Sequence, residues 1–371
     1  MTPASHSTPA KLATWFMRRT ALNGVRRVAP LNAAIASDVG AVRQENQDRV
    51  AVVRGSDLTG SPFILAALAD GIGGMKNGSE CAAIALGTFI DCIATEAQHN
   101  LDPLRWMERA CTQANMAVWS KHSGEGGSTL VAILLTTLGQ PIWLSVGDSR
   151  VYQANGGNLL QLSRDDTLEG QLGKPIEGGR RSELLQFVGI GEALEPHVEY
   201  FPLDTNGTIL LTTDGVHFVE QEFLARVVFH APDIGLCAKR LTEVAKMLGG
   251  PDNASVVAIS VEALQVDSDA PLDSTLEVWD PFGELQVLFE RGSRDSAYSA
   301  KTTISPTKAV AERDTAVNPA TTPSKPTNKG KQPKKSKSSK KPRQKDDITD
   351  ANEDNPSEKP QLVIEFPRKT S

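Results

Sequence analysis

The chain has 371 residues, of which 39% are hydrophobic, enough for one large domain or two ordinary ones. Residues 301–371 hold 16 Lys and Arg against 9 Asp and Glu, which leaves 23 against 36 for residues 1–300. So acidic a body repels the phosphates of nucleic acids, which argues against nucleic-acid binding except weakly through the Lys-rich tail.

The four cysteines show neither a C-x-x-C pair nor a zinc-ligand spacing. Three of them lie in apolar helical patterns, where thiols pack as small hydrophobes. We therefore expect no disulfides and a reducing, cytoplasmic compartment. No apolar run reaches the ~18 residues of a membrane span, so no span is predicted.

From residue 33 onward, strand-like and helix-like patterns follow one another in pairs. Strands are predicted over residues 33–40, 49–55, 62–70, 128–139, 141–148, 149–156, 158–163, 198–203, 207–215 and 254–264. Helices are predicted over residues 79–98, 103–121, 222–230 and 236–249. Strand pairs joined by short turns and interrupted by paired helices indicate an α+β fold, with mainly antiparallel sheets covered by helices.

Composition divides the chain into four parts: a basic N-terminal extension (1–32), a folded domain (33–263), a short apolar segment (264–299) and a Lys-, Ser- and Pro-rich tail (300–371). The extension contains no acidic residue, and it is either a disordered or lightly ordered basic arm or an organellar targeting peptide. The apolar segment either docks on the domain or serves as a recognition peptide. The tail cannot bury enough apolar surface to offset its ordering entropy, so we predict that it is disordered.

Aspartates at the ends of predicted strands are the main functional signal. There are five of them: Asp48, Asp70, Asp148, Asp214 and Asp252. A carboxylate in such a place is partly desolvated and costly alone, but several are tolerated when a cation neutralises them. Hard oxygen ligands of this kind select Mg²⁺ or Mn²⁺. Taken singly, an Asp-Gly pair after a strand is most often just a turn. Five such sites in one domain predict a metal centre.

Six motifs surround these aspartates in a fixed order: SDVGAVRQENQDR, LADGIGGMKNGSECA, GGSTLVAILL, SVGDSRVY, LLTTDG and GGPDNASVVAISV. Together they resemble the type 2C metal-dependent serine/threonine protein phosphatases, the PPM family, and in particular its bacterial branch. The resemblance covers about residues 33–263, which would then be the phosphatase domain. It implies two stacked, mainly antiparallel β-sheets flanked by helix pairs, an α-β-β-α sandwich.

The resemblance also implies roles for individual residues. Asp48 matches the first metal-binding acid, Asp70 the acid that bridges two metals, and Gly71 the residue that offers its backbone carbonyl. Asp214 and Asp252 match the two downstream metal ligands.

Two further positions complete the implied site. Arg43 matches the arginine that grips the substrate phosphate, a role that suits a planar, bidentate guanidinium. Asp148 matches an acid that binds a weaker third ion together with Asp214. The implied reaction is hydrolysis of phosphoserine and phosphothreonine by water that two Mn²⁺ or Mg²⁺ ions activate, with Arg43, Asp70 and Asp214 as the catalytic residues. The implied partners are a phosphorylated protein substrate and the serine/threonine kinase that opposes the enzyme.

Some positions depart from the family pattern. Gln47 stands where eukaryotic members carry Glu, and Ile72 stands where they carry a histidine proposed as general acid, so the leaving-group acid is not identified. Asp166 replaces the customary histidine in the segment 163–196, which normally forms a flap beside the active site. Substrate choice is therefore the property that transfers least.

Two polar residues beside the aspartates are expected to support the site. Asn253 follows Asp252 and is expected to orient the site, whereas His217, near Asp214, is expected to be ordinary packing. The alternative hypothesis for the whole chain is a non-catalytic regulator that keeps the fold and binds a partner, with the tail as its tether. Regulators of that kind usually lose one or more metal acids, and this chain keeps them.

Overall fold

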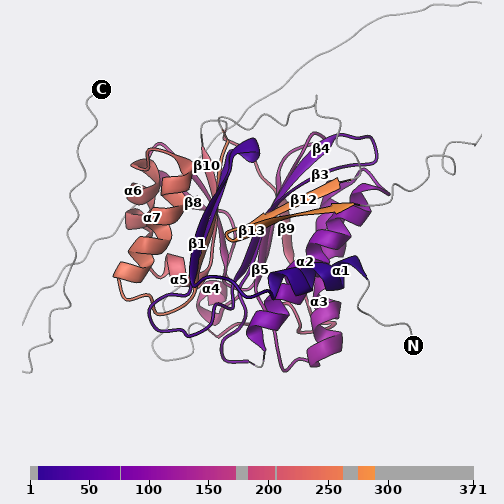
Figure 1. Ribbon diagram of the computed structural model, residues 1–371, viewed down its shortest axis with the longest axis horizontal. Helices are drawn as coiled ribbons and strands as arrows, with labels where there is room; N and C mark the ends of the chain where they lie inside the picture. Colours follow the sequence, from indigo (N-terminus) through magenta and orange to yellow (C-terminus); the bar gives the residue numbers. More distant parts are fainter. Residues whose placement is uncertain (1–6, 76, 173–182, 205–206, 262–274, 289–371) are drawn as a thin grey trace, which may run out of the picture. The chain divides into compact units, whose positions relative to one another are not determined.

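The structure is a computed structural model that describes residues 7–75, 77–172, 183–204, 207–261 and 275–288. These residues form two β-sheets that lie face to face, with helices on both outer faces (Figure 1). Neighbouring strands in both sheets run antiparallel. The predicted α-β-β-α sandwich is confirmed.

The first sheet has six strands in the order β1-β2-β11-β10-β7-β8. Its strands are β1 (Asn23–Val28), β2 (Ala33–Asp38), β7 (Arg150–Asn155), β8 (Asn158–Gln161), β10 (Thr208–Thr212) and β11 (Ala254–Ser260). Its outer face is covered by α5 (Asp214–His217), α6 (Gln221–Phe229) and α7 (Ile234–Met247). Side chains of a strand alternate between faces, so Ala34 and Ala36 of β2 face these helices while Ala33 and Ile35 face the second sheet.

The second sheet has seven strands in the order β13-β12-β3-β4-β5-β6-β9. Its strands are β3 (Arg49–Ser56), β4 (Pro62–Ala69), β5 (Leu130–Thr136), β6 (Ile142–Val146), β9 (His197–Tyr200), β12 (Thr275–Asp280) and β13 (Gly283–Leu288). Its outer face is covered by α1 (Thr8–Phe16), α2 (Gly78–Ala97) and α3 (Pro103–His122). A 3-10 helix, η2 (Ala29–Leu31), links β1 to β2, and a short helix, α4 (Leu168–Leu172), follows β8.

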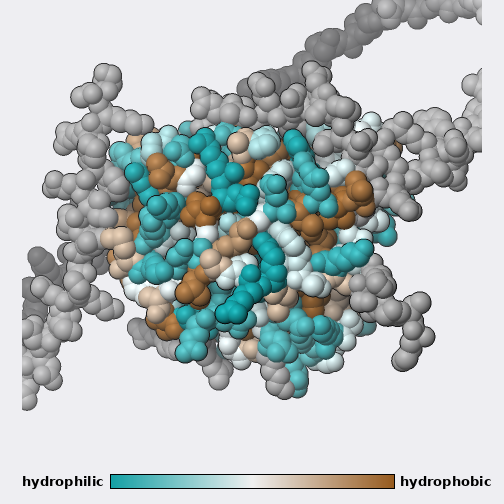
Figure 2. All heavy atoms as spheres, in the orientation of Figure 1, coloured by the Kyte–Doolittle hydropathy of each residue, from teal (hydrophilic) through white to brown (hydrophobic). Residues whose placement is uncertain are grey.

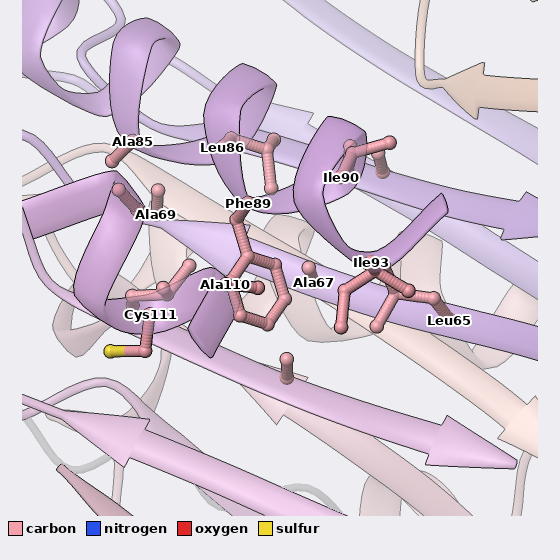
Figure 3. Packing of buried hydrophobic residues seen from close by; sticks show 14 of the residues in the cluster. Leu65, Ala67, Ala69, Ala85, Leu86, Phe89, Ile90, Ile93, Ala110 and Cys111 are labelled. Carbon is pink, nitrogen blue, oxygen red and sulfur yellow. The ribbon is translucent and has the colours of Figure 1, made fainter. Parts of the chain in front are cut away.

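Helix α2 is the centre of the helical layer on the second sheet. Figure 3 shows its side chains Phe89 and Ile93 directed toward small residues of β4 and α3, including Ala67 and Ala110. Small partners let the helix approach the sheet closely, so that the side chains of Phe89 and Ile93 are fully enclosed. By length and composition alone α2 would pass as a membrane span, although 72% of its apolar window is buried inside the protein, as in a core helix.

Replacement of Phe89 by alanine tests this packing. Phe89 is completely buried, so removal of its ring would leave a cavity among the side chains packed around it. Phe89→Ala is expected to lower the free energy of unfolding by about 3–5 kcal/mol. Chemical denaturation measures the change, with Leu160→Ala, on the exposed side of β8, expected to stay within about 0.5 kcal/mol of wild type.

Ordered structure extends beyond residues 33–263 on both sides. Strand β1 pairs with the whole length of β2, and α1 packs on α2 through Leu12 and Phe16. Part of the predicted N-terminal extension is thus regular structure. Its basic composition gave no sign of a strand, because Arg26 and Arg27 lie on β1, at the edge of the sheet. In the apolar segment, β12 and β13 form a hairpin that joins the second sheet through β3, so it docks as one alternative proposed. The predicted disordered tail lies outside the described residues.

Candidate active site

The antiparallel register places the ends of several strands at one edge of the sandwich. The first residue of β3, Arg49, pairs with the last residue of β4, Ala69, so Asp48 and Asp70 flank the same edge. In the other sheet, the start of β11 pairs with the end of β2 and the end of β10, which places Asp252 and Asp214 at one end of that sheet.

A hydrogen bond joins the two sheets at this edge. Thr213 Oγ1, between β10 and α5, donates to Asp48 Oδ2 at 3.1 Å and accepts from the Ser255 amide at 2.9 Å. Asp148 follows β6 and precedes β7, whose first residue pairs with the last residue of β10. All five predicted aspartates therefore gather at one end of the sandwich. Thr213 was not singled out by the sequence, although its place directly before the Asp214-Gly215 pair, a predicted metal ligand and its glycine, is a usable signal.

Burial and mutual repulsion raise the pKa values of these carboxyl groups. Burial, with added repulsion from Asp214 and Asp252, raises the pKa of Asp48 to about 7. Burial and the charge of Asp48 raise the pKa of Asp70 well above its usual range. Burial also raises the pKa of Asp148 to about 7 and that of Asp214 to about 6. Acids that destabilise one another in this way are the kind of group that a cation stabilises.

Two carboxylate oxygens are buried without a hydrogen-bond partner within the described part of the chain: Asp48 Oδ1 and Asp214 Oδ1. Asp48 is 4% exposed, so water does not compensate the missing bond. Oxygen atoms left in this state fit the ligand set of a hard divalent cation. The residues present are therefore compatible with bound Mn²⁺ or Mg²⁺.

No group of three or more His, Cys, Asp or Glu side chains among the described residues is arranged to hold a single ion. This differs from the electrostatic picture, in which the five aspartates perturb one another. Mg²⁺ retains several waters and uses only one or two carboxylates, so two ions can share these aspartates without any set of three around one point.

The glycines after Asp70 and Asp214 are required by close packing. A Cβ atom at Gly71 would lie 2.3 Å from the carbonyl oxygen of Gly78 at the start of α2. A Cβ atom at Gly215 would lie 1.9 Å from the carbonyl oxygen of Asn253. Both contacts hold the turn beside an aspartate against a neighbouring segment. The role of the Gly71 carbonyl as a metal ligand stays a prediction.

Arg43 lies at the rim of the acidic cluster. Its Nη2 atom bonds Asp252 Oδ2 at 2.6 Å, and its side chain is 39% exposed. The hydrogen bond to Asp252 raises the pKa of Arg43, so the guanidinium is charged at any physiological pH. A Cβ atom at Gly73 would lie 2.6 Å from Arg43 Nη1, so that position leaves room for the guanidinium. A cation in this place can face both the cluster and a phosphate from solvent.

Asn253 fixes the loop that carries Arg43. Its side-chain Nδ2 donates to the carbonyl oxygens of Val39 and Glu45, both at 2.9 Å. Its Oδ1 accepts from the backbone amide of Gln47 at 2.7 Å. The side chain is 3% exposed. The residue that follows Asp252 therefore orients the segment from Val39 to Gln47, which we call the Arg43 loop.

Two other sequence-based interpretations can be compared with the geometry. His217 is buried, its Nδ1 lies 2.9 Å from Thr212 Oγ1, and burial lowers its pKa well below the usual value, which fits ordinary packing. Asp166, in place of the customary histidine, accepts from the Gly147 amide at 2.9 Å and contacts His197 Nε2 at 2.9 Å. It therefore ties the turn before Asp148 to the edge strand β9.

A cleft of about 350 Å³ opens beside this cluster. Its lining includes Asp148, Asp214 and Asp252, together with Thr167 and Glu169. Three of the five aspartates therefore border a cleft that is open to solvent.

Comparison with known proteins identifies the class to which this fold and site belong. A model of the protein phosphatase 2C family matches residues 41–247, more than half of the chain. The chain belongs to this family. Its relatives are serine/threonine phosphatases, and the chain is a protein-serine/threonine phosphatase.

Individual relatives are distant in sequence. The serine/threonine phosphatase stp of Listeria welshimeri is 25% identical over 256 residues, covering 65% of this chain and 100% of that protein. The serine/threonine protein phosphatase PstP of Mycobacterium tuberculosis is 29% identical over 245 residues, covering 62% of this chain and 45% of that protein.

Two solved structures show the same fold. The PPM Ser-Thr phosphatase MsPP of Mycobacterium smegmatis, in complex with cacodylate, superposes with a TM-score of 0.53 at 28% identity over 62% of this chain and 97% of that one. The catalytic domain of PstP, in complex with two manganese ions, gives a TM-score of 0.51 at 27% identity over 64% and 98%.

Proposed function

We propose that this phosphatase hydrolyses phosphoserine and phosphothreonine in proteins with two divalent cations, Mn²⁺ or Mg²⁺. The observation that carries the proposal is the set of buried, mutually repelling carboxylates with two unpartnered oxygens beside Arg43. Two manganese ions in the related PstP domain support the same assignment. The residues that would hold the ions are Asp48, Asp70, Gly71 through its carbonyl, Asp214 and Asp252, with Asp148 and Asp214 for a weaker third ion.

The chain's own groups would perform the remaining tasks. When bound, the ions supply Lewis acidity and a water whose pKa lies near neutrality. Arg43 binds two phosphate oxygens through its planar guanidinium and offsets the charge that develops on them. Thr213 fixes the orientation of Asp48, and Asn253 fixes the Arg43 loop. Because water attacks the phosphate directly, no covalent phosphoenzyme is needed.

The cellular setting is also part of the proposal. We place the enzyme in the cytoplasm, where it would oppose a serine/threonine kinase by removing the phosphates that the kinase transfers.

Removal of the Arg43 side chain tests the proposed function. With the full chain and Mn²⁺, Arg43→Ala is expected to lower kcat/KM for a phosphothreonine peptide by about 100-fold, because a charge-assisted bidentate contact is lost. Arg226→Ala, an exposed arginine on α6, is the matched control and should behave as wild type. Wild-type hydrolysis that EDTA leaves unchanged would contradict the metal-dependent mechanism.

A further inference from the structure

Large apolar side chains that face solvent gather around the Arg43 loop. Their exposed fractions range from 41% to 68%, and they are Met17, Leu22, Val42, Met247 and Leu248. We call these five residues the apolar rim. On the face seen in Figure 2, brown apolar atoms lie among teal hydrophilic ones.

Hydrogen bonds place parts of the rim beside this loop. The carbonyl oxygen of Leu22 accepts from the Val39 amide at 2.9 Å, at the start of the loop. The sulfur of Met17 accepts from Arg49 Nη2 at 3.7 Å, just beyond the loop's end. The Ala41 amide donates to the carbonyl oxygen of Gly250 at 2.9 Å, two residues after Leu248.

A cavity of about 430 Å³ adjoins the rim on one side. Its apolar walls include Phe16, Met17, Leu22 and Phe282, and residues 44–46 of the Arg43 loop complete it. It also contains charged groups, namely Arg18, Arg19, Glu45, Asp48, Arg49 and Asp280. The cavity therefore begins one residue after the arginine that would hold the phosphate.

An ion pair fixes the wall of this cavity. Arg18 Nη2 contacts both carboxylate oxygens of Asp280 at 2.7 Å, and Arg18 Nη1 donates to the Trp15 carbonyl oxygen at 2.9 Å. The guanidinium also lies over the Trp15 ring, 3.8 Å from its centroid. These contacts lock α1 to the β12–β13 turn, so the pocket is formed in advance of binding.

We propose that the apolar rim and this cavity dock phosphoprotein substrates that carry apolar side chains close to the phosphorylated Ser or Thr. The proposal rests on the proposed function, because it requires the phosphate to lie at Arg43. An extended peptide advances about 3.3 Å per residue, so residues two to four positions from the phosphate reach roughly 7–13 Å from Arg43. They must therefore pass over the surface that surrounds the Arg43 loop.

The preference for apolar side chains near the phosphorylated residue is expected to be specific to this chain. Met17 and Leu22 precede the region that the family model matches, residues 41–247, and the β12–β13 turn follows it. An exposed apolar surface bordered by polar groups next to an active site is the usual mark of an interaction site.

Two phosphothreonine peptides of otherwise identical sequence test the proposal with the full chain and Mn²⁺. One carries Leu, and the other Ser, at the second and third positions on both sides of the phosphothreonine. Wild type is expected to show a kcat/KM at least about tenfold higher for the Leu peptide, mainly through a lower KM. In the double variant Leu22→Ser, Met247→Ser, which changes two rim residues outside the Arg43 loop, this ratio is expected to fall to about two or less.

Hydrolysis of p-nitrophenyl phosphate, which has no peptide flanks, should be unchanged in the double variant. Leu160→Ser, which removes a side chain 61% exposed on β8, is the matched control and should keep the full ratio. Equal kcat/KM for the two peptides with wild type would overturn the docking proposal alone. A failure to hydrolyse either peptide would overturn the proposed function as well. A rim that mediates only self-association, seen as a dimer that the double variant abolishes without any change in peptide preference, would also overturn the docking proposal.

Discussion

Asp48→Asn is expected to abolish metal-dependent hydrolysis and at the same time to stabilise the metal-free protein at pH 8. The loss of one carboxylate ligand should lower kcat/KM by at least about 100-fold. The gain in stability follows from burial, which raises the pKa of Asp48 to about 7. A carboxylate with an unfolded pKa near 4 and a folded pKa near 7 is ionised at pH 8 in a place that disfavours its charge.

The gain in the free energy of unfolding that Asp48→Asn brings is expected to grow as the pH rises. Between about pH 4 and pH 7 the folded protein binds more protons than the unfolded chain, so metal-free wild type loses stability as the pH rises through this range. Well above pH 7 Asp48 is fully ionised in both states, so the free energy of unfolding that its burial removes no longer changes with pH. The asparagine, which is neutral throughout, should therefore be more stable than wild type by roughly 2–4 kcal/mol at pH 8 and by almost nothing at pH 4.

Chemical denaturation in EDTA at the two pH values measures this difference. Asp57→Asn is a matched control, because Asp57 is also 4% exposed but accepts hydrogen bonds from the Thr59 amide, the Thr59 hydroxyl and the Ser61 amide. It lies just after β3, at the opposite end of that strand from Asp48, so the control should lose stability and keep its activity. If Asp48→Asn lost stability at pH 8 as the control does, the idea of a cluster held in mutual repulsion would be wrong.

The acidic cluster could be predicted from the sequence because each of its members carries a local signal. A carboxylate at the end of an apolar run, as in PFILAALAD, is unusual in itself, and five such aspartates point to one ion-binding site. The sandwich could be predicted because β2, β4 and β11 are almost wholly buried strands with plain apolar runs.

Other features could not be predicted, because their signal lies in long-range pairing. Strand β1 reads as a basic stretch, and only its full pairing with β2 makes it a strand. Thr213 is an ordinary threonine in the sequence, and its contact with Asp48 joins residues 165 positions apart. The cavity walls formed by α1 and the β12–β13 turn meet through the Arg18–Asp280 pair, whose members are 262 positions apart.

The second large effect is expected at Asn253. Asn253→Ala would leave three backbone groups of the Arg43 loop without partners: the carbonyl oxygens of Val39 and Glu45 and the amide of Gln47. An unpaired buried polar group costs about 1–3 kcal/mol, so the loop should detach or the domain should lose roughly 3–5 kcal/mol. Either outcome moves Arg43 and the Asp48 end of the loop relative to the rest of the acidic cluster.

A loss of metal binding and of substrate binding should accompany the loss of stability. The affinity for Mn²⁺ is expected to fall by about 10- to 100-fold, as is usual when a residue that orients metal ligands is removed. The KM for a phosphothreonine peptide should rise as well, because Arg43 no longer has a fixed position. Calorimetric titration with Mn²⁺ gives the first quantity, and steady-state kinetics gives the second.

Asn115→Ala separates a specific effect from general destabilisation. Asn115 is 2% exposed and also makes three hydrogen bonds, from the Gly189 and Gly191 amides and to the Gly191 carbonyl. Its partners lie on the segment that precedes β9, so its loss should cost a similar amount of stability but change the Mn²⁺ affinity by less than about threefold. Equal losses of Mn²⁺ affinity in the two variants would show that Asn253 acts only through stability, and the role of the Arg43 loop as a fixed platform would fail.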